Sequence, residues 1–307
     1  MNEVTLYVEN VDKHTLIVSV YVDDLLIAGD KEQLVEEFKT NMKDKFEMNE
    51  LGLLSYFLGM EVTQSEQGCF LCQKRFTMKL QNKFVMENCK PVSTPTVLRQ
   101  KLMKEDGAPK TDGKAYRSLV GSLLYLTATR PDIVFTVNYL SRFMQSPSQI
   151  HFVAAKRVLR YLKGTLEFGM HFVKSSSVKL VGFSDSDWAG SDEEMMSTSG
   201  YCFAIGGSIF CWNSKKQSVV AHSTAEAEYI AAYMAAKQLI WLRKMTKHMK
   251  IKFHAIRQFQ QEGELEMIYC TSKEQLADLF TKPLAKDRFE DLREMIGMCS
   301  FGTKEEC

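Results

Sequence analysis

Apolar and polar residues alternate along this chain with two periods, one typical of strands and one typical of helices. Two short apolar runs rich in β-branched residues occupy 16–28 and flank an acidic pair, which predicts strand, turn, strand. Residues 31–46 place apolar side chains at helical spacing. Further strands are predicted at 56–62 and 69–73, and a helix at 75–87. The beginning of the chain is therefore expected to mix strands and helices.

A proline-rich stretch interrupts these periodic segments. Residues 91–115 hold three of the six prolines, and we interpret them as a linker. Residues 116–145 and 148–163 then show helical spacing, with Pro131 opening a new helix and Pro147 separating two helical blocks. We assign 116–175 to a helical connection. The predicted organisation is a first domain at 1–90, the linker, and a helical connection.

The pattern changes again at residue 179. Three short strands with turn residues between them precede a helix at about 224–244, a basic stretch and a helix to about 262. A strand at 264–270 and a final helix complete the pattern. This order predicts a mixed α/β domain over 179–295, and the whole chain is expected to be of mixed α/β class.

Composition narrows the function only a little. The chain is 45% hydrophobic and 25% charged, as in soluble globular proteins, and its formal net charge is +1. A role with nucleic acid must therefore rest on local basic patches. No signal peptide or membrane-length apolar stretch is present, so we expect a cytoplasmic or nuclear protein that is not secreted. Cys69 and Cys72 form a single CxxC without a second pair, which favours scattered reduced thiols over a zinc site.

Asp23 and Asp24 are two adjacent carboxylates inside an apolar segment. Burial of a bare carboxylate costs several kcal/mol, roughly, unless it is paired or binds a cation. Magnesium together with substrate phosphates is the usual partner of such a cluster. A hairpin turn with solvated aspartates explains the same spacing, and the spacing alone leaves both interpretations open.

Three acids later in the chain lie at the ends of predicted elements. Asp185 ends an apolar strand, with Asp187 on the same strand face, and Asp278 lies in a short helix. Glu226 fits a capping box with Ser223. Each has an ordinary alternative role, as a turn residue, a helix cap or a first-turn acid favoured by the helix dipole. The face of the 224–244 helix that we expect to pack inward carries Glu226, Tyr229, Ile230 and Tyr233.

Several ordered blocks resemble the Pol polyprotein of Ty1/copia-type retrotransposons. LIVSVYVDDLLIAGD is similar to the palm hairpin of that family's reverse transcriptase, and LGLLSYFLGMEV to its primer-grip region. The segment from YRSLVGS to LRYLKGT resembles the connecting helices of that family. LVGFSDSDWAG, STSGYCFAIGG, WNSKKQSVVAHSTAEAEYIAA and EQLADLFTKPL resemble its ribonuclease H domain. The resemblance implies a truncated palm and thumb-like region, a helical connection, and an incomplete RNase H-like mixed sheet with flanking helices.

The resemblance also implies function. The family synthesises DNA on an RNA template and hydrolyses the RNA strand of RNA–DNA hybrids, with Mg²⁺ held by carboxylates in two-metal sites. The implied partner is a hybrid or another nucleic acid, without a membrane or a small-molecule cofactor, and the oligomeric state stays open. The residues that map onto the family's catalytic and metal-binding acids are Asp23, Asp24, Asp185, Glu226 and Asp278.

Each implied site departs from the family by one carboxylate. The family places a polymerase aspartate well upstream of YVDD, whereas the sequence given starts about twenty residues before it. The family's nuclease has a fourth acid, yet no Asp occurs between Asp192 and Asp278. We therefore expect an internal deletion near 244/245 and a catalytically impaired protein. The alternatives are an active Mg-dependent ribonuclease H and a non-catalytic nucleic-acid-binding relic.

Two basic segments are candidates for contact with nucleic acid. One lies in the helix predicted at 151–163 and the other follows the helix at 224–244. Either is explained by a solvated helix surface or helix end. As phosphate contacts they would bind without regard to base sequence. The candidate residues are Lys156, Arg157, Arg160, Lys163, Arg243, Lys244, Lys247 and Lys250.

Overall fold

The computed structural model describes residues 6–11, 14–175, 179–190, 195–247 and 266–301. Within these ranges the chain divides into two compact units, with the boundary between Leu53 and Leu54. No helix in the described ranges is both long enough and apolar enough to cross a membrane.

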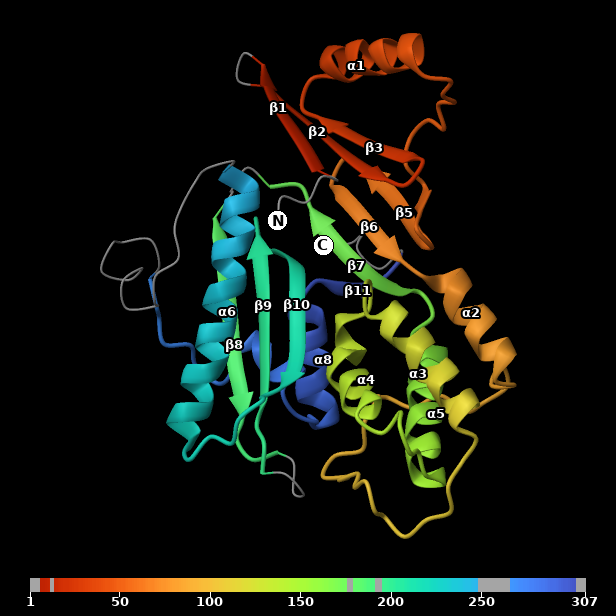
Figure 1. The fold of residues 1–307 in the computed structure, drawn as a ribbon, viewed down its shortest axis with the longest axis vertical. Helices are drawn as coiled ribbons and strands as arrows, with labels where there is room; N and C mark the ends of the chain where they lie inside the picture. The colour runs from red at the N-terminus through yellow and green to blue at the C-terminus, as the bar shows by residue number, and fades with distance from the viewer. Residues whose placement is uncertain (1–5, 12–13, 176–178, 191–194, 248–265, 302–307) are drawn as a thin grey trace. The chain divides into compact units, whose positions relative to one another are not determined.

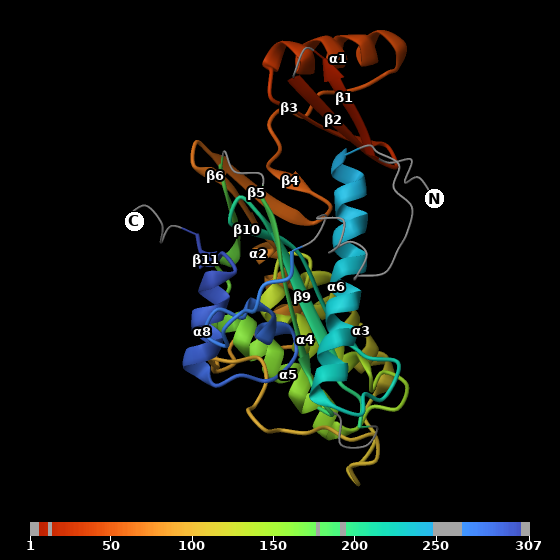
Figure 2. The same cartoon turned by 90° about the vertical axis from the view of Figure 1, so that its left-hand side faces the viewer.

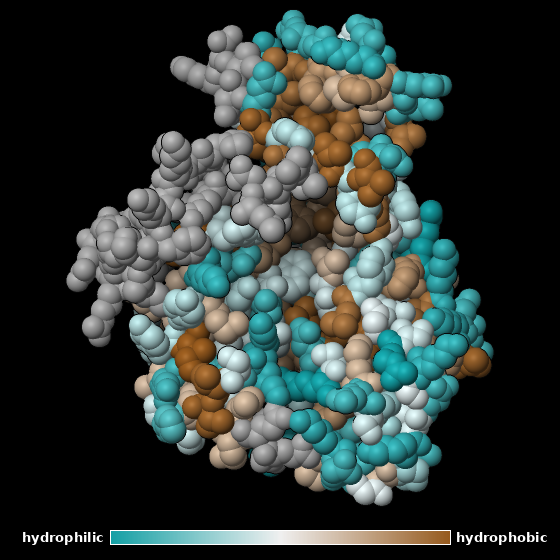
Figure 3. Space-filling view, viewed as in Figure 1, coloured by the Kyte–Doolittle hydropathy of each residue, from teal (hydrophilic) through white to brown (hydrophobic). Residues whose placement is uncertain are grey.

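The first unit is an antiparallel sheet with one helix (Figure 1). Its strands follow one another in the order β1-β2-β3, and Leu16 and Val18 of the central strand are buried. The helix presents hydrophilic residues outward, with hydrophobic residues beneath it (Figure 3). The strand–turn–strand and helix predictions are confirmed. The elements are β1 (Leu6–Val11), β2 (His14–Tyr21), β3 (Asp24–Gly29) and α1 (Glu32–Lys45).

The second unit begins with a five-stranded antiparallel sheet whose strands come from three distant parts of the sequence. Its order is β11-β7-β6-β5-β4. Helix α2 (Lys74–Lys83) follows β6, the strand that carries Cys69 and Cys72 as free thiols. The strands are β4 (Tyr56–Phe57), β5 (Met60–Ser65), β6 (Gly68–Cys72), β7 (Phe168–Val173) and β11 (Met298–Ser300).

Four helices form the apolar centre of the second unit. The first is capped by Asp112, whose carboxylate accepts from two backbone N–H groups, and the last by a capping box of Ser148 and His151. Pro131 opens a short helix at its first turn, as the sequence predicts. The helical block before Pro147 thus consists of three helices, with the break that the sequence predicts at Pro131. The elements are α3 (Gly113–Leu126), η1 (Pro131–Ile133), α4 (Val134–Ser141) and α5 (Gln149–Gly164).

A second antiparallel sheet, of order β10-β9-β8, lies between helices (Figures 1 and 2). Helix α6 packs on β8 and β9 from one side, and η2 packs on the same two strands from the other. The three strands and the long helix agree with the sequence prediction. The elements are β8 (Leu180–Asp187), β9 (Thr198–Ile205), β10 (Ser208–Lys216), α6 (Thr224–Lys247), η2 (Leu276–Phe280) and α8 (Lys286–Met295).

The last part of the chain differs from the sequence prediction. The strand predicted at 264–270 is wrong over its described part, because residues 266–270 have no regular structure. The helix predicted to end near 262 lies outside the described residues. The expected junction at 244/245 falls inside α6, whose backbone continues to Lys247.

The stretch interpreted as a linker is bonded to the helices along its length. Pro91 faces Gly164 at the end of α5, and the Leu102 N–H donates to the Tyr139 hydroxyl at 2.9 Å. His151 contacts the Met103 carbonyl through its Nε2 at 3.0 Å. Residues 91–104 therefore run along α4 and α5 within the second unit.

Candidate active site

Asp23 and Asp24 lie in the tight turn between β2 and β3. Tyr21 pairs with Asp24 across the hairpin, and both aspartates are exposed to solvent. Val22, at the tip, has a φ of 53°, which is an unfavourable conformation for a β-branched residue. The first unit thus presents two solvated carboxylates on a strained turn.

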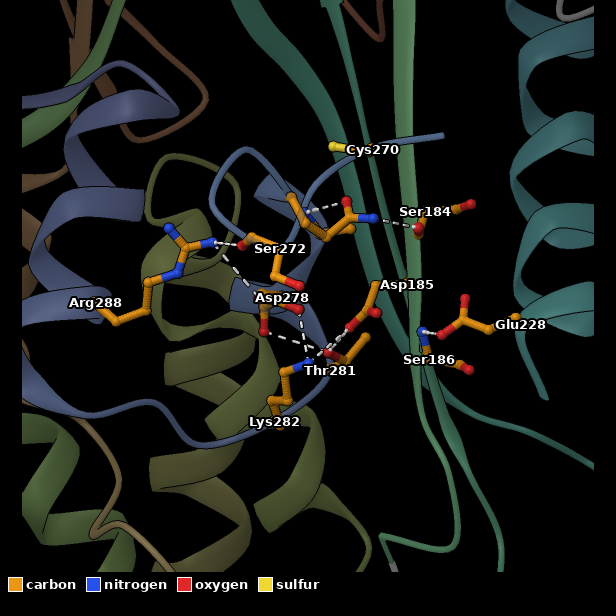
Figure 4. Close-up of polar contacts among 12 residues, drawn as sticks. Ser184, Asp185, Ser186, Glu228, Cys270, Ser272, Asp278, Thr281, Lys282 and Arg288 are labelled. Atoms are coloured by element: carbon orange, nitrogen blue, oxygen red, sulfur yellow. Dashed lines mark hydrogen bonds and ion pairs between the residues drawn. The ribbon is translucent and has the colours of Figure 1, made fainter. Parts of the chain in front are cut away.

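Asp185 and Asp278 lie close together in the second unit, although 93 positions separate them in the sequence. Lys282 Nζ is 2.7 Å from Asp278 Oδ1 and 3.4 Å from Asp185 Oδ2 (Figure 4). Thr281 donates its hydroxyl to Asp185 Oδ2 at 2.5 Å, and Arg288 Nη2 is 3.6 Å from Asp278 Oδ2. Two carboxylates and two cations therefore form a compact cluster on one side of β8, which we call the acidic centre.

A glycine allows this approach. Gly200 on β9 pairs with Asp185 on β8, and η2 lies directly over it. A Cβ at this position would be 2.7 Å from Phe280 Cβ and 2.8 Å from Thr281 Cγ2, well inside van der Waals contact. The absent side chain therefore lets η2 reach the sheet, which brings Asp278 and Thr281 to Asp185.

Gln275 fixes the start of η2 against the edge of β8. Its side-chain oxygen accepts from the Ala277 N–H at 3.3 Å, and its amide nitrogen donates to the Ser184 carbonyl at 3.0 Å. Ser184 and Ser186 are two positions apart, so their backbone groups face the same edge of the strand. At the acidic centre, side chains thus provide hydrogen-bond partners for backbone groups on this edge of β8.

Glu228, which the sequence prediction did not include, reaches that edge from the opposite side of the sheet. Its Oε1 accepts from the Ser186 N–H at 3.3 Å (Figure 4). Partial burial, together with the negative charge of Asp185, raises the pKa of Glu228. Glu228 is therefore an acid beside Asp185 that the sequence prediction missed.

Glu226 lies elsewhere. It is exposed, its Oε2 accepts from the His222 N–H at 2.7 Å, and its own N–H donates to the Ser223 hydroxyl at 3.1 Å. These are the bonds of a helix cap. The prediction that Glu226 shares an inward face with Tyr229 and Tyr233 is wrong, because the tyrosines are 60% and 52% exposed.

A stripe of alanines faces the sheet instead. Ala227, Ala231 and Ala235 repeat every four residues and are buried, because small side chains let α6 approach the strands closely. Glu228 lies seven positions before Ala235 and so shares its side of the helix, given the helical period of 3.6 residues. The alanine spacing is the sequence signal that identifies Glu228.

Burial and neighbouring charges shift the pKa values of the ionisable groups at the acidic centre. Burial raises the pKa of Asp185, and the nearby Asp278 charge adds to the rise against the opposing effects of Thr281 and Lys282. Burial also raises the pKa of Asp187. Burial works against the charge on Lys282, but its hydrogen bond to Asp278 and the two aspartate charges outweigh this and raise its pKa. The lysine is thus held as the counter-ion of the aspartates.

Comparison of the sequence with known proteins shows the family to which the chain belongs. Residues 1–98 match the family described as reverse transcriptase (RNA-dependent DNA polymerase). The chain is 34% identical, over 97% of its length, to the Pol polyprotein from transposon RE1 of Arabidopsis thaliana, and 33% identical, over 94%, to that from transposon TNT 1-94 of Nicotiana tabacum. The chain belongs to the reverse transcriptase family of retrotransposon Pol polyproteins. It is also 32% identical, over 74% of its length, to the putative transposon Ty5-1 protein of Saccharomyces cerevisiae, of which it covers 75%.

This retrotransposon Pol segment is short beside its full-length relatives. It spans 23% of the RE1 polyprotein and 25% of the TNT 1-94 polyprotein. No solved structure matches it. The activities of the whole polyproteins are therefore not transferred to it directly.

The Pol segment can be tested for fit to the metal ions that its family uses. Carboxylate oxygens are the right donors for Mg²⁺. Among the residues described, Asp185 and Asp278 converge, and Lys282 Nζ already lies between them. No group of three His, Cys, Asp or Glu side chains suited to a metal occurs in the ranges that the structure describes. The described arrangement does not fit a two-metal centre.

The predicted basic residues divide into two sets. On α5, Arg157 Nη2 donates to Thr94 Oγ1 at 3.1 Å and Arg160 Nε donates to the Lys90 carbonyl at 2.8 Å. Lys156 Nζ lies 5.0 Å from the centroid of the Phe152 ring. In the second set, only the backbone of Arg243, Lys244 and Lys247 is described, within α6, and Lys250 lies outside the described residues.

Proposed function

We propose that this Pol segment is a reverse transcriptase and ribonuclease H remnant whose nuclease centre is catalytically impaired. Its proposed parts are a palm- and thumb-derived region at 1–90, a linker at 91–115, a helical connection at 116–175 and a nuclease-derived domain at 179–295. The family resemblance of the sequence blocks supports the descent. The proposed partner is an RNA–DNA hybrid, and the ancestral cofactor is Mg²⁺.

The observation that carries impairment is the position of Lys282. Two-metal hydrolysis needs carboxylates that fix both ions beside the scissile phosphate. Here Asp185 and Asp278 share one ammonium group, 3.4 and 2.7 Å away, and Glu228 is bonded to the backbone of Ser186. Because the three acids do not converge on a common point, they are not preorganised to hold two ions.

An internal deletion is part of the proposal. The alignment with the RE1 polyprotein spans 331 positions but uses 97% of the 307 residues, which is about 298. About 33 aligned positions therefore lack a counterpart in this chain. That excess is what the loss of an internal segment produces, and the absence of any Asp between Asp192 and Asp278 supports the loss of an acid with it.

A hybrid-cleavage assay tests the proposal. The purified chain is incubated with Mg²⁺ and a hybrid whose RNA strand is end-labelled, beside an Asp185→Asn variant prepared in parallel. We expect both proteins to give the same background, because contaminating host nucleases act equally in both preparations. Mg²⁺-dependent cleavage by the wild type that Asp185→Asn abolishes would refute impairment and establish an active ribonuclease H.

A further inference from the structure

The start of helix α5 is bonded to the segment that precedes α3, residues 103–111. The Gln149 N–H donates to the Pro109 carbonyl at 2.9 Å, and the Thr111 N–H donates to the Pro147 carbonyl at 3.0 Å. These backbone bonds link parts of the chain that are about forty positions apart. We call residues 103–111, held in this way against the start of α5, the bound segment.

A buried histidine joins the two parts. His151 lies fully buried in the first turn of α5, and its ring stacks on the ring of Phe143 with the centroids 4.0 Å apart. The Ser148 N–H nitrogen is 3.0 Å from its Nδ1, and the Met103 carbonyl oxygen is 3.0 Å from its Nε2. A backbone N–H only donates and a carbonyl only accepts. The ring is therefore neutral, with its proton on Nε2.

A second proton on this ring conflicts with its surroundings. The proton would be on Nδ1, so that it and the Ser148 N–H would be two donors facing each other, and the capping box would lose a bond. The cation would also be buried at the positive end of the helix dipole, which disfavours it. The His151 ring must therefore leave both partners before it is protonated, and the contact with Met103 is lost with it.

Asp106 is the carboxylate that faces the ring, and its charge has the opposite effect. Its Oδ2 is 3.7 Å from His151 Nε2, which favours a cationic ring. Charge-assisted hydrogen bonds are about 2.7–2.9 Å long, so this contact does not replace the bonds that protonation removes. The same oxygen accepts from the buried Ser148 hydroxyl. That hydrogen bond lowers the pKa of Asp106.

The other charged groups on the neighbouring elements make contacts elsewhere. Arg142 donates to a threonine hydroxyl of β9 at 3.2 Å, and Arg117 on α3 donates to a backbone carbonyl after α4 at 3.2 Å. Asp112 accepts from the first N–H groups of α3, and Lys156 on α5 lies over the Phe152 ring. The remaining charged residues of the bound segment are exposed, namely Lys104, Glu105 and Lys110.

We propose that His151 is a proton-sensitive lock whose protonation releases residues 103–111 from the start of α5. In the open form the imidazole is exposed and gains a proton near pH 6.5, as an ordinary histidine does. Opening therefore takes up one proton, and the ratio of open to closed forms rises up to about tenfold for each pH unit below that value. Asp106 is charged in both forms down to about pH 4, so its stabilising effect is lost only below this range.

Hydrogen exchange of the full chain tests the lock. Protection factors of the Thr111, Ser148 and Gln149 amides are measured at pH 7 and pH 5, with the intrinsic exchange rates divided out. We expect protection to fall about 25-fold between the two, because one proton with an ordinary histidine affinity accompanies opening. Amides of α2, which lies away from the lock, should keep their protection within about twofold. Equal or greater protection of the three amides at pH 5 would overturn the proposal.

His151→Gln removes the titration and keeps an acceptor. Glutamine at this position of a capping box accepts from the same backbone N–H as His151 does. The variant should therefore show the same protection at pH 5 and pH 7, within about twofold. The matched control is His222→Gln, which removes an exposed imidazole before α6 and should keep the 25-fold change. Wild-type pH dependence in His151→Gln, or its loss in His222→Gln, would contradict the assignment to His151.

The imidazole signals of the wild type give a test that does not depend on a variant. Nitrogen NMR at pH 7 should show His151 as a neutral ring with its proton on Nε2. As the pH falls, signals of the cationic ring should grow in step with the loss of amide protection at Ser148 and Gln149. A cationic ring beside amides that are still protected would refute the lock, as would a proton on Nδ1 at pH 7.

Discussion

Gly200→Ala places one methyl group in the contact that assembles the acidic centre. The new Cβ would be 2.7 Å from Phe280 Cβ, 2.8 Å from Thr281 Cγ2 and 3.1 Å from the Ala277 carbonyl oxygen. Carbon atoms prefer about 3.5–4.0 Å, so η2 must move away from β9 by about 1 Å. Overpacking of this kind costs about 1–3 kcal/mol in the free energy of unfolding.

The same displacement disrupts the polar contacts. Thr281 donates to Asp185 at 2.5 Å, and a shift of about 1 Å stretches that bond to the limit of hydrogen bonding. We expect the raised pKa of Asp185 to rise further, because this hydrogen bond and Lys282 both favour its charged form. Urea unfolding measures the stability change, and carboxyl NMR titration follows Asp185.

Gly121→Ala is the matched control. Gly121 lies in α3 with no atom within 4 Å of an added Cβ, so the same substitution should stabilise the protein by about 0.5–1 kcal/mol through helix propensity. Opposite signs for the two variants support the packing argument. Gly200→Ala with wild-type stability and an unchanged Asp185 titration would refute the role assigned to Gly200.

Three further predictions concern Asp185, the two glutamates of α6 and Val22. Folding raises the pKa of Asp185, so above that raised pKa the ionised carboxylate lowers the stability of the folded state. Asp185→Asn should therefore raise the unfolding midpoint at pH 7. The gain should vanish as the pH falls through the raised pKa. A loss of stability at pH 7 would contradict this. Glu226→Ala should cost about 0.5–1 kcal/mol by removing a helix cap, whereas Glu228→Gln, which keeps an acceptor for Ser186, should not destabilise in the same urea assay. Val22→Gly should stabilise the first unit by about 1 kcal/mol, because glycine adopts a φ of 53° without strain. Hydrogen exchange of the β2 and β3 amides measures this gain in stability. Faster exchange in the variant would contradict the proposed strain at Val22.

Local patterns predicted the local structure well. The two apolar runs around Asp23 and Asp24 indicate the hairpin because each strand and the turn depend on neighbours in sequence. The proline at 131 likewise marks a helix start. The joining of β11 to β7 had no such signal, since Met298 pairs with Met170 across a long stretch of sequence.

The candidate site was harder to predict for a related reason. Asp185 and Asp278 were identified through resemblance, but what brings them together is the missing side chain of Gly200, a property of the packed structure. Glu226 was identified through the same resemblance, and the large side chains of its helix were expected to pack inward. On α6 the small ones do, and the alanine spacing places Glu228 toward β8.

The most direct test of the central claim is a Mg²⁺ titration of the wild-type chain, followed through the amide signals of Asp185, Ser186 and Glu228. The account predicts no saturable shift up to millimolar Mg²⁺, because Lys282 holds the two aspartates and Glu228 does not converge with them. Saturable shifts at these three residues that Asp185→Asn removes would contradict it, since they would show a metal centre assembled from these acids.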